Sequence, residues 1–385
     1  MPPKKTVRRS SGRTLETAEG NRIEGLDLTP RMLLGRSIAL YGPSGSGKTV
    51  FVKYILSLLV DFSDQAIVIC PTEPANQAYR GVIPPQMIHY SMTAPDPKNP
   101  RKRIDGPKGA IEFLTLVYQR QEARCAMAKR ANNLETLRSL YNRLSGPTRR
   151  KCDDDVRQIE ESRAAAYKSV RRQKPAERDE HRERIDDRLA EMEKLVLKKY
   201  ISEEYQRLWG RQREMTEDER TALTYLHFKP DLILIFDDCA AEIKSLLNKE
   251  IFRKLFYQGR HCKITTIFCC QDETDLGPNL RKNVFTSVFT DADMFRASCA
   301  RRGNGLNRAE RARVMDICDE IFSAEYRKLV YIRDDPQKHH YYHFTPPLVR
   351  PRVFGSAAVQ ELCARVGTDG SGIDHDNPFY KDYEV

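Results

Sequence analysis

The sequence predicts an α/β fold in which a mostly parallel central sheet is interrupted by a large helical insertion. Three observations predict it. Short apolar runs occur at Ser37–Tyr41 and Leu232–Phe236, a glycine-rich segment follows the first run, and a long charged stretch separates the two. Continuous apolar runs of this length are typical of parallel strands that are covered on both faces. A chain of 385 residues is long enough for one such core and an appendage.

The core elements are expected in a regular order along the chain. The run Ser37–Tyr41 is followed by an apolar-rich helix over Val50–Val60 and by a strand over Ala66–Cys70, and the sheet resumes at Leu232–Phe236. The remaining expected elements are a helix at Glu242–Tyr257, strands at Ile264–Cys270 and Val284–Thr290, a helix at Arg308–Ser323, and strands at Lys328–Ile332 and His340–Phe344.

Composition divides the chain into four parts. Residues 1–24 form a basic arm that is expected to be disordered. Residues 25–95 and 228–345 form the predicted core. Residues 96–227 form an inserted, charged helical subdomain, which Gly146-Pro147 and Pro175 divide into three expected helices, two of which can pair as an antiparallel hairpin. Residues 346–385, with many Pro and Gly, form a loosely packed C-terminal extension.

Charge and cysteine usage narrow the class of protein. The net charge of +11 and the pI near 9.1 favour a polyanionic partner, because Lys and Arg gain affinity by neutralising phosphates. The ten cysteines show no C-x-x-C pair, which argues against a zinc site and indicates reduced thiols in an intracellular compartment. No apolar run approaches the roughly 20 residues that a membrane span needs.

A phosphate-binding loop is predicted where the first strand ends. The pattern G-x-x-x-x-G-K-[ST] is matched in full by Gly42, Pro43, Ser44, Gly45, Ser46, Gly47, Lys48 and Thr49. In this pattern backbone N–H groups converge on phosphates, Lys48 reaches the β and γ oxygens, and Thr49 offers its hydroxyl to Mg²⁺. The predicted ligands are therefore ATP and Mg²⁺.

Polar residues at two further strand ends complete the predicted site. Asp237 and Asp238 follow an apolar strand, as a magnesium-supporting Walker B element requires. We expect Asp237 to hold the metal shell and Asp238 to orient or deprotonate the attacking water. Gln271 ends the strand that the doubly wound order places between the loop strand and the Walker B strand. An amide at this position can contact both the γ-phosphate and the water.

The phosphoryl transition state spreads negative charge that an arginine can stabilise, and in a ring-forming ATPase this arginine can come across the subunit boundary. Arg260 is the first candidate, since it ends the helix before the Gln271 strand, and Arg281 just beyond that strand is the second. Either residue can instead be a helix-end or surface cation.

Taken together, these motifs resemble those of the DNA-packaging ATPases of nucleocytoplasmic large DNA viruses, a branch of the FtsK/HerA superfamily. The resemblance covers residues 25–95 and 228–335 and implies a RecA-like P-loop NTPase core. It assigns the nucleotide roles to Lys48, Thr49, Asp237, Asp238 and Gln271. The wider superfamily usually has Glu where this chain has Asp238.

The resemblance also implies what the protein does and where. It implies an ATPase that forms a homo-oligomeric ring, translocates double-stranded DNA, contacts capsid or portal-vertex proteins and packages viral genomic DNA. The implied location is a viral factory in the host cytoplasm, with the nucleus and the virion as alternatives. Three other functions stay open: a translocase of a mobile element, a P-loop small-molecule kinase, and an ATP-dependent assembly switch.

Overall fold

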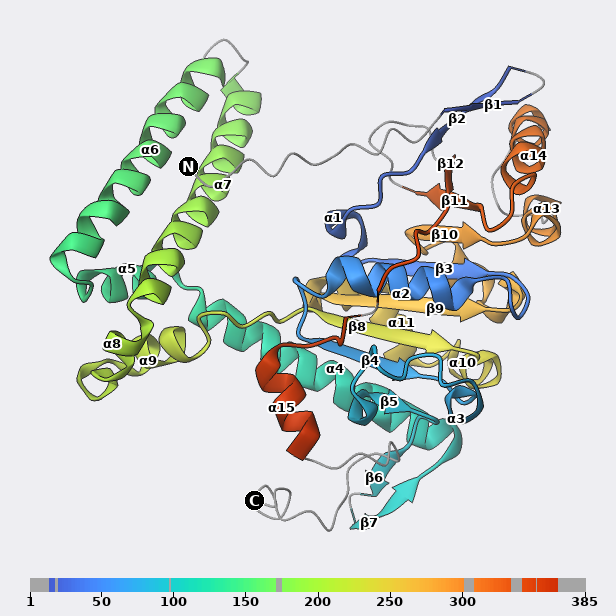
Figure 1. Cartoon of the computed structure of the whole chain (residues 1–385), viewed down its shortest axis with the longest axis horizontal. Coiled ribbons are helices and arrows are strands. Elements are labelled where there is room, and N and C mark those ends of the chain that lie inside the picture. Colours follow the sequence, from blue (N-terminus) through green and yellow to red (C-terminus); the bar gives the residue numbers. More distant parts are fainter. Residues whose placement is uncertain are drawn as a thin grey trace. The chain divides into compact units, whose positions relative to one another are not determined.

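The structure, a computed structural model, describes residues 14–17, 20–96, 98–170, 175–300, 308–333, 341–350 and 352–365. The chain divides into two compact units. Unit 1 comprises Met1–Glu122 and Pro230–Val385, and unit 2 comprises Ala123–Lys229. Figure 1 shows both units, with most of their elements labelled.

Unit 1 is built on a ten-stranded sheet. In chain order its strands are β1 (Leu15–Glu16), β2 (Arg22–Gly25), β3 (Ser37–Tyr41), β4 (Gln65–Ile69), β5 (Ile88–His89), β8 (Leu232–Asp237), β9 (Ile264–Cys270), β10 (Thr286–Phe289), β11 (Lys328–Ile332) and β12 (Tyr341–Phe344). A separate two-stranded sheet pairs β6 (Ala94–Asp96) with β7 (Asn99–Ile104).

The order across the large sheet is β1-β2-β12-β11-β10-β3-β9-β8-β4-β5. All neighbours from β10 to β5 are parallel, whereas β11 runs antiparallel to both β10 and β12. The predicted α/β class with a mostly parallel sheet is therefore confirmed, and β9 lies between β3 and β8.

Helices flank the sheet of unit 1 and make up unit 2. In unit 1 they are α1 (Pro30–Leu33), α2 (Lys48–Leu59), α3 (Glu73–Asn76), α10 (Ala240–Leu246), α11 (Glu250–Gln258), α12 (Pro278–Arg281), α13 (Ala292–Ala300), α14 (Arg308–Phe322) and α15 (Ala357–Arg365). In unit 2 they are α5 (Leu134–Asn142), α6 (Gly146–Val170), α7 (Pro175–Glu203), α8 (Tyr205–Trp209) and α9 (Glu217–Thr224). The helix α4 (Gly106–Ala131) begins in unit 1 and ends in unit 2.

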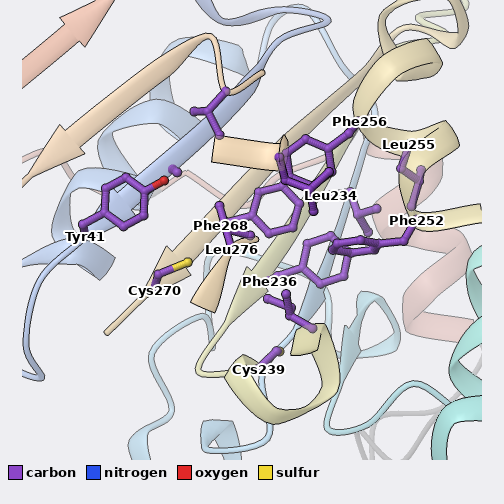
Figure 2. Close-up of a cluster of buried hydrophobic side chains, with 14 of the residues drawn as sticks. Tyr41, Leu234, Phe236, Cys239, Phe252, Leu255, Phe256, Phe268, Cys270 and Leu276 are labelled. Carbon is purple, nitrogen blue, oxygen red and sulfur yellow. The ribbon is translucent and has the colours of Figure 1, made fainter. Parts of the chain in front are cut away.

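Two apolar clusters cover the two faces of the sheet. Successive strand side chains point to opposite faces, so Ile235 of β8 packs with α2 while Phe236 packs with α11. On the second face the rings of Phe236 and Phe256 each stack on Phe268 with centroids 4.8 Å apart (Figure 2). Each fully buried side chain of this size contributes about 1.5–3 kcal/mol to stability.

The boundaries of the parts differ from those that composition indicates. The first half of α4 belongs to unit 1, because Ala110, Phe113, Leu114 and Tyr118 lie on one helix face and pack into its core. The charged residues between them hide this apolar stripe in the composition.

Both ends of the chain are also partly built into unit 1. Within the expected arm, β1 and β2 form a strand pair in which Ile23 is 1% exposed, while residues 1–13 lie outside the described residues. Beyond β12, Phe354 is 1% exposed and its amide donates to the Val82 carbonyl over 2.7 Å. The last 20 positions, 366–385, lie outside the described residues.

Unit 2 is helical, as expected of the insertion, but holds more helices than three. Gly146 and Pro175 begin α6 and α7, which run side by side as a hairpin (Figure 1). Pro suits the first turn of a helix because its missing N–H would have no partner there. Leu137, Ile201 and Leu223 lie in the apolar core of the unit.

A buried carboxylate ties α5 to α9 within unit 2. Glu219 is 2% exposed and accepts hydrogen bonds from Arg143, Ser139 and the amide of its N-cap, Thr216. Burial opposes ionisation, but these hydrogen bonds outweigh it and lower the pKa of Glu219 to about 2. Since the folded-state pKa is depressed, this contribution is present above pH 4.5 and is lost as pH falls towards 2.

We therefore expect Glu219→Gln to destabilise unit 2 by about 3 kcal/mol, because the Arg143 guanidinium loses its buried partner. Thermal or urea unfolding of the full chain, followed by the single Trp209 of unit 2, measures this loss. The exposed Glu217→Gln is the matched control. Equal stability of the two variants would contradict the assigned role of Glu219.

The cysteine side chains are almost all buried. All ten cysteines lie outside disulfides, and nine are buried while Cys125 is only partly so. Burial raises the pKa of Cys70 and Cys152 to about 11, which keeps these thiols protonated.

Within the described ranges, every helix is too short or too polar to cross a membrane.

Candidate nucleotide-binding site

The glycine-rich loop lies at the carboxyl edge of the sheet, where β3 ends and α2 begins. The amide of Gly42 donates to the carbonyl of Cys270 at the end of β9 over 3.2 Å. A Cβ atom at Gly42 would lie 1.7 Å from Thr290 Oγ1, so no other residue fits there. Gly47 is the N-cap of α2 and has a φ of 86°, in the left-handed region that favours glycine.

The predicted loop lysine lies inside this turn. Lys48 is 7% exposed, and its ammonium donates to the carbonyls of Gly42 and Pro43 over 2.6 and 2.8 Å. The N-terminus of α2 adds the partial positive charge of its free amides. Loop, lysine and helix thus present hydrogen-bond donors and positive charge in one place, which is suited to phosphate.

The first predicted acid ends β8 in a buried position. Asp237 is 5% exposed and accepts a hydrogen bond of 2.7 Å from the hydroxyl of Tyr79. Burial raises the pKa of Asp237, the hydrogen bond from Tyr79 opposes this rise, and the charge of Asp238 adds to it. A nearby cation would favour the ionised carboxylate.

The second predicted acid is held by two polar side chains. Thr72 donates to Asp238 Oδ2 over 2.8 Å, and Gln271 Nε2 donates to Oδ1 over 3.4 Å. Asp238 has a φ of 55°, and aspartate adopts this left-handed conformation more readily than most residues.

These residues surround one cleft of about 390 Å³. Its lining joins the phosphate loop, which precedes the insertion in the chain, with the acids, which follow it. The lining residues are Ser44, Gly45, Gly47, Lys48, Thr49, Val50, Cys70, Thr72, Asn76, Ala78, Asp237 and Asp238. Gln271 does not line the cleft and reaches it through Asp238.

The donor set fits Mg·ATP. Loop amides and Lys48 would hold the phosphates, and the Thr49 hydroxyl and the Asp237 carboxylate would hold Mg²⁺. In the described residues no group of three or more His, Cys, Asp and Glu side chains forms an all-protein metal site. Mg²⁺ commonly takes one or two protein ligands and completes its shell with phosphate oxygens and water.

The two arginine candidates lie in different environments. Arg281 forms an ion pair of 3.1 Å with Glu273, whose side chain is 3% exposed. Arg260 is exposed, in the 3₁₀ helix η3 (Gly259–Cys262) at the amino end of β9. That end is opposite the edge where Gly42 and Asp238 lie, so Arg260 cannot reach the nucleotide cleft of its own chain.

Arg260 shares its surroundings with two other arginines. A hollow of about 290 Å³ is lined by Arg36, Arg260 and Arg333, and no acidic residue contributes to its lining. The Arg36 guanidinium stacks on the Phe285 ring at 4.1 Å from the centroid. The hollow is therefore suited to an anion.

Sequence reasoning missed four residues of the site. Thr72 and Tyr79 hold the two acids. Thr290 Oγ1 lies 2.7 Å from Ser46 Oγ, and Lys328 donates to the Ser46 carbonyl over 2.6 Å. None of them belongs to a motif. Thr290, which directly follows the parallel strand β10, and Thr72, which follows β4 after Cys70 and Pro71, carry the signal of a polar residue near a parallel strand end.

A phosphate loop at the carboxyl edge of a parallel sheet, with one strand between the loop strand and the strand that carries the acids, defines a RecA-like P-loop NTPase fold. No family model matches the chain. It is 36% identical over 374 residues to the uncharacterized protein B354L of African swine fever virus isolate Pig/Kenya/KEN-50/1950, covering 96% of this chain and 99% of that protein. The B354L protein of strain Badajoz 1971 Vero-adapted matches with the same identity and coverage. The chain therefore belongs to the B354L family, and the viral kinship expected from the motifs is confirmed.

Solved structures with similar chain paths include two nucleotide complexes. The genome packaging NTPase B204 from Sulfolobus turreted icosahedral virus 2, in complex with ATP-gammaS, has a TM-score of 0.33 and 10% identity, covering 82% of this chain and 98% of that one. The pCW3 conjugation coupling protein TcpA, with ATPgS, has a TM-score of 0.39 and 10% identity, covering 94% of this chain and 72% of that one.

The contact between Tyr79 and Asp237 leads to a test of the predicted Mg²⁺ site. Tyr79→Phe removes the hydroxyl that orients Asp237, and loss of such an orienting group typically weakens metal affinity about 10-fold or more. We expect the Mg²⁺ concentration that half-saturates nucleotide binding to rise by this factor, as measured by Mg²⁺ titration. The exposed Tyr90→Phe serves as the control. Identical Mg²⁺ curves for the two variants would argue against Asp237 as a metal residue.

Proposed function

We propose that this chain is an ATPase that hydrolyses Mg·ATP in the cleft and couples hydrolysis to the translocation of double-stranded DNA. The observation that carries the proposal is the position of Asp238. It lines the same cleft as Lys48 and Thr49, and Thr72 and Gln271 hold its two carboxylate oxygens. An oriented carboxylate beside a phosphate site can position and deprotonate a water molecule.

The proposed division of labour follows from the chemistry of each group. Bound Mg²⁺ would neutralise charge on the phosphates. Lys48 and the loop amides would bind and orient the phosphate chain, and Asp238 would accept the proton of the attacking water. Gln271, through its contact with Asp238, would report whether the γ-phosphate is present. Phosphoryl transfer depends mainly on such positioning and electrostatic stabilisation.

We propose further that the DNA is viral genomic DNA and that the chain packages it. The net charge of +11 supports a polyanionic partner, and the viral relatives support a role in a virus. On this proposal the chain works as a homo-oligomeric ring at the capsid or portal vertex. Its location is then a viral factory in the cytoplasm of the infected cell, with the nucleus and the virion as alternatives.

In such a ring Arg260 would act on the nucleotide of a neighbouring copy. A closed ring places unlike surfaces of adjacent copies against each other. Arg260 lies at the amino edge of the sheet, and the nucleotide cleft lies at the opposite, carboxyl edge. An arginine that one copy supplies to the nucleotide of the next copy needs this arrangement. Arg281 is held by a buried carboxylate, which supports Arg260 as the choice between the two.

Steady-state ATP hydrolysis with and without linear double-stranded DNA tests the motor function. We expect DNA to raise turnover several-fold at fixed moderate salt, because phosphate contacts weaken as salt rises. Lys48→Ala removes phosphate binding, and Asp238→Asn should lower turnover about 100-fold. The exposed Asp293→Asn is the control for loss of a carboxylate. Hydrolysis that ignores DNA would sink the translocase proposal and favour a small-molecule acceptor, whereas unaltered function in Asp238→Asn would favour an assembly switch.

Mixing two inactive variants tests the trans role of Arg260. Lys48→Ala and Arg260→Ala should each abolish hydrolysis alone. In an equimolar mixture, some interfaces pair an intact Lys48 with an intact Arg260 of the neighbouring copy, so we expect a fraction of the activity to return. Failure of the mixture to regain activity, with mixed rings verified by native mass spectrometry, would exclude action between copies.

A further inference from the structure

A buried lysine outside the sequence motif lies against the phosphate loop. Lys328 is the first residue of β11 and is 2% exposed. Its ammonium donates to the Ser46 carbonyl over 2.6 Å, and a Cβ atom on Gly47 would lie 3.4 Å from its Nζ. The side chain therefore ends directly at the Ser46–Gly47 peptide.

The charge of this lysine lacks an acidic partner among the described residues. Its hydrogen bond goes to a backbone carbonyl, and the charge that acts on it is the like charge of Lys48. Burial, and then the charge of Lys48, lower the pKa of Lys328. A buried cation is costly unless an anion compensates it, and a methionine of the same length would fill the space without that cost.

The contact has a defined effect on the loop. A planar trans peptide directs its C=O and its N–H to opposite sides, and the described residues contain no cis peptide. Since the Ser46 carbonyl faces Lys328, the N–H of the same peptide, which belongs to Gly47, points away from Lys328. Gly47 lines the nucleotide cleft.

The sheet holds Ser46 from two neighbouring strands. Thr290, just after β10, contacts the Ser46 hydroxyl, while Lys328 of β11 binds the Ser46 carbonyl. The strands β10 and β11 are paired, with Leu329 opposite Phe289. The middle of the loop is thus anchored to the sheet, while Lys48 holds its beginning through Gly42 and Pro43.

We propose that Lys328 is a positioning residue of the nucleotide site, which turns the Gly47 N–H towards the phosphates of a nucleoside di- or triphosphate and adds a second buried positive charge behind the loop. The bound polyphosphate supplies the anion that compensates this charge. The inference rests on the proposed function in so far as the cleft binds ATP, but it does not require DNA or a ring.

Nucleotide affinities of Lys328→Met test the proposal. Loss of one charge-assisted contact predicts about tenfold weaker binding of ATP and ADP, measured by calorimetry on the full chain, and unchanged binding of adenosine. Lys328→Gln keeps a hydrogen-bond donor without the charge, so its affinity should lie between those of Lys328→Met and the wild type. The exposed Lys249→Met is the matched control.

The stability of the nucleotide-free protein separates positioning from a merely structural role. We expect the melting temperature of Lys328→Met to stay within about 4 °C of the wild type, because the lost hydrogen bond is offset by removal of an uncompensated buried charge. In the 42–50 segment, hydrogen exchange of the loop amides should become faster in Lys328→Met.

The outcomes distinguish this inference from the proposed function. Wild-type chain that does not bind ATP, or that binds it equally well after Lys48→Ala, would remove the proposed function itself. If Lys328→Met and Lys328→Gln bind ATP and ADP as tightly as the wild type, only the role of Lys328 would be overturned. Loss of the fold in both variants without nucleotide would also overturn it, because the lysine would then serve the structure alone.

Discussion

The parallel pairing of β3, β9 and β8 is the constraint on which the whole site depends. In its register Tyr41 lies opposite Cys270, and Cys269 lies opposite Asp237, so the three strands end at the same level. The loop, the glutamine and the acids therefore start from one edge of the sheet. A sheet of this kind needs cover on both faces, and the two apolar clusters, on α2 and on α4, α10 and α11, supply it.

Local pattern was sufficient for the parts of the site that each lie within one segment. The strands at Ser37–Tyr41, Ile264–Cys270 and Lys328–Ile332 have the bounds expected from their apolar runs. The spacing of its glycines identifies the loop, and the two acids stand at the end of a strand that a few apolar residues indicate. The geometry around Asp238 adds what the pattern cannot contain, namely which side chains hold its oxygens.

The supporting residues could not be predicted because their environment is created by distant segments. Lys328 has the sequence context of an ordinary lysine at a strand start, and only the antiparallel pairing of β11 beside β10 buries it against the loop. Tyr79 follows a short helix and a turn and carries no motif, yet it is fully buried against Asp237. The first half of α4 has the composition of the insertion for a related reason: charges dominate it, while its apolar stripe emerges only when the helix packs on the sheet.

The burial of the thiols has a practical consequence for the study of motion. Nine of the ten cysteines are shielded by packing, and the remaining one, Cys125, lies on α4 in unit 2. A maleimide fluorophore therefore has one preferred native attachment point, without the removal of any other cysteine. The chain carries, in effect, an intrinsic handle by which single-molecule spectroscopy can follow the insertion with and without added nucleotide.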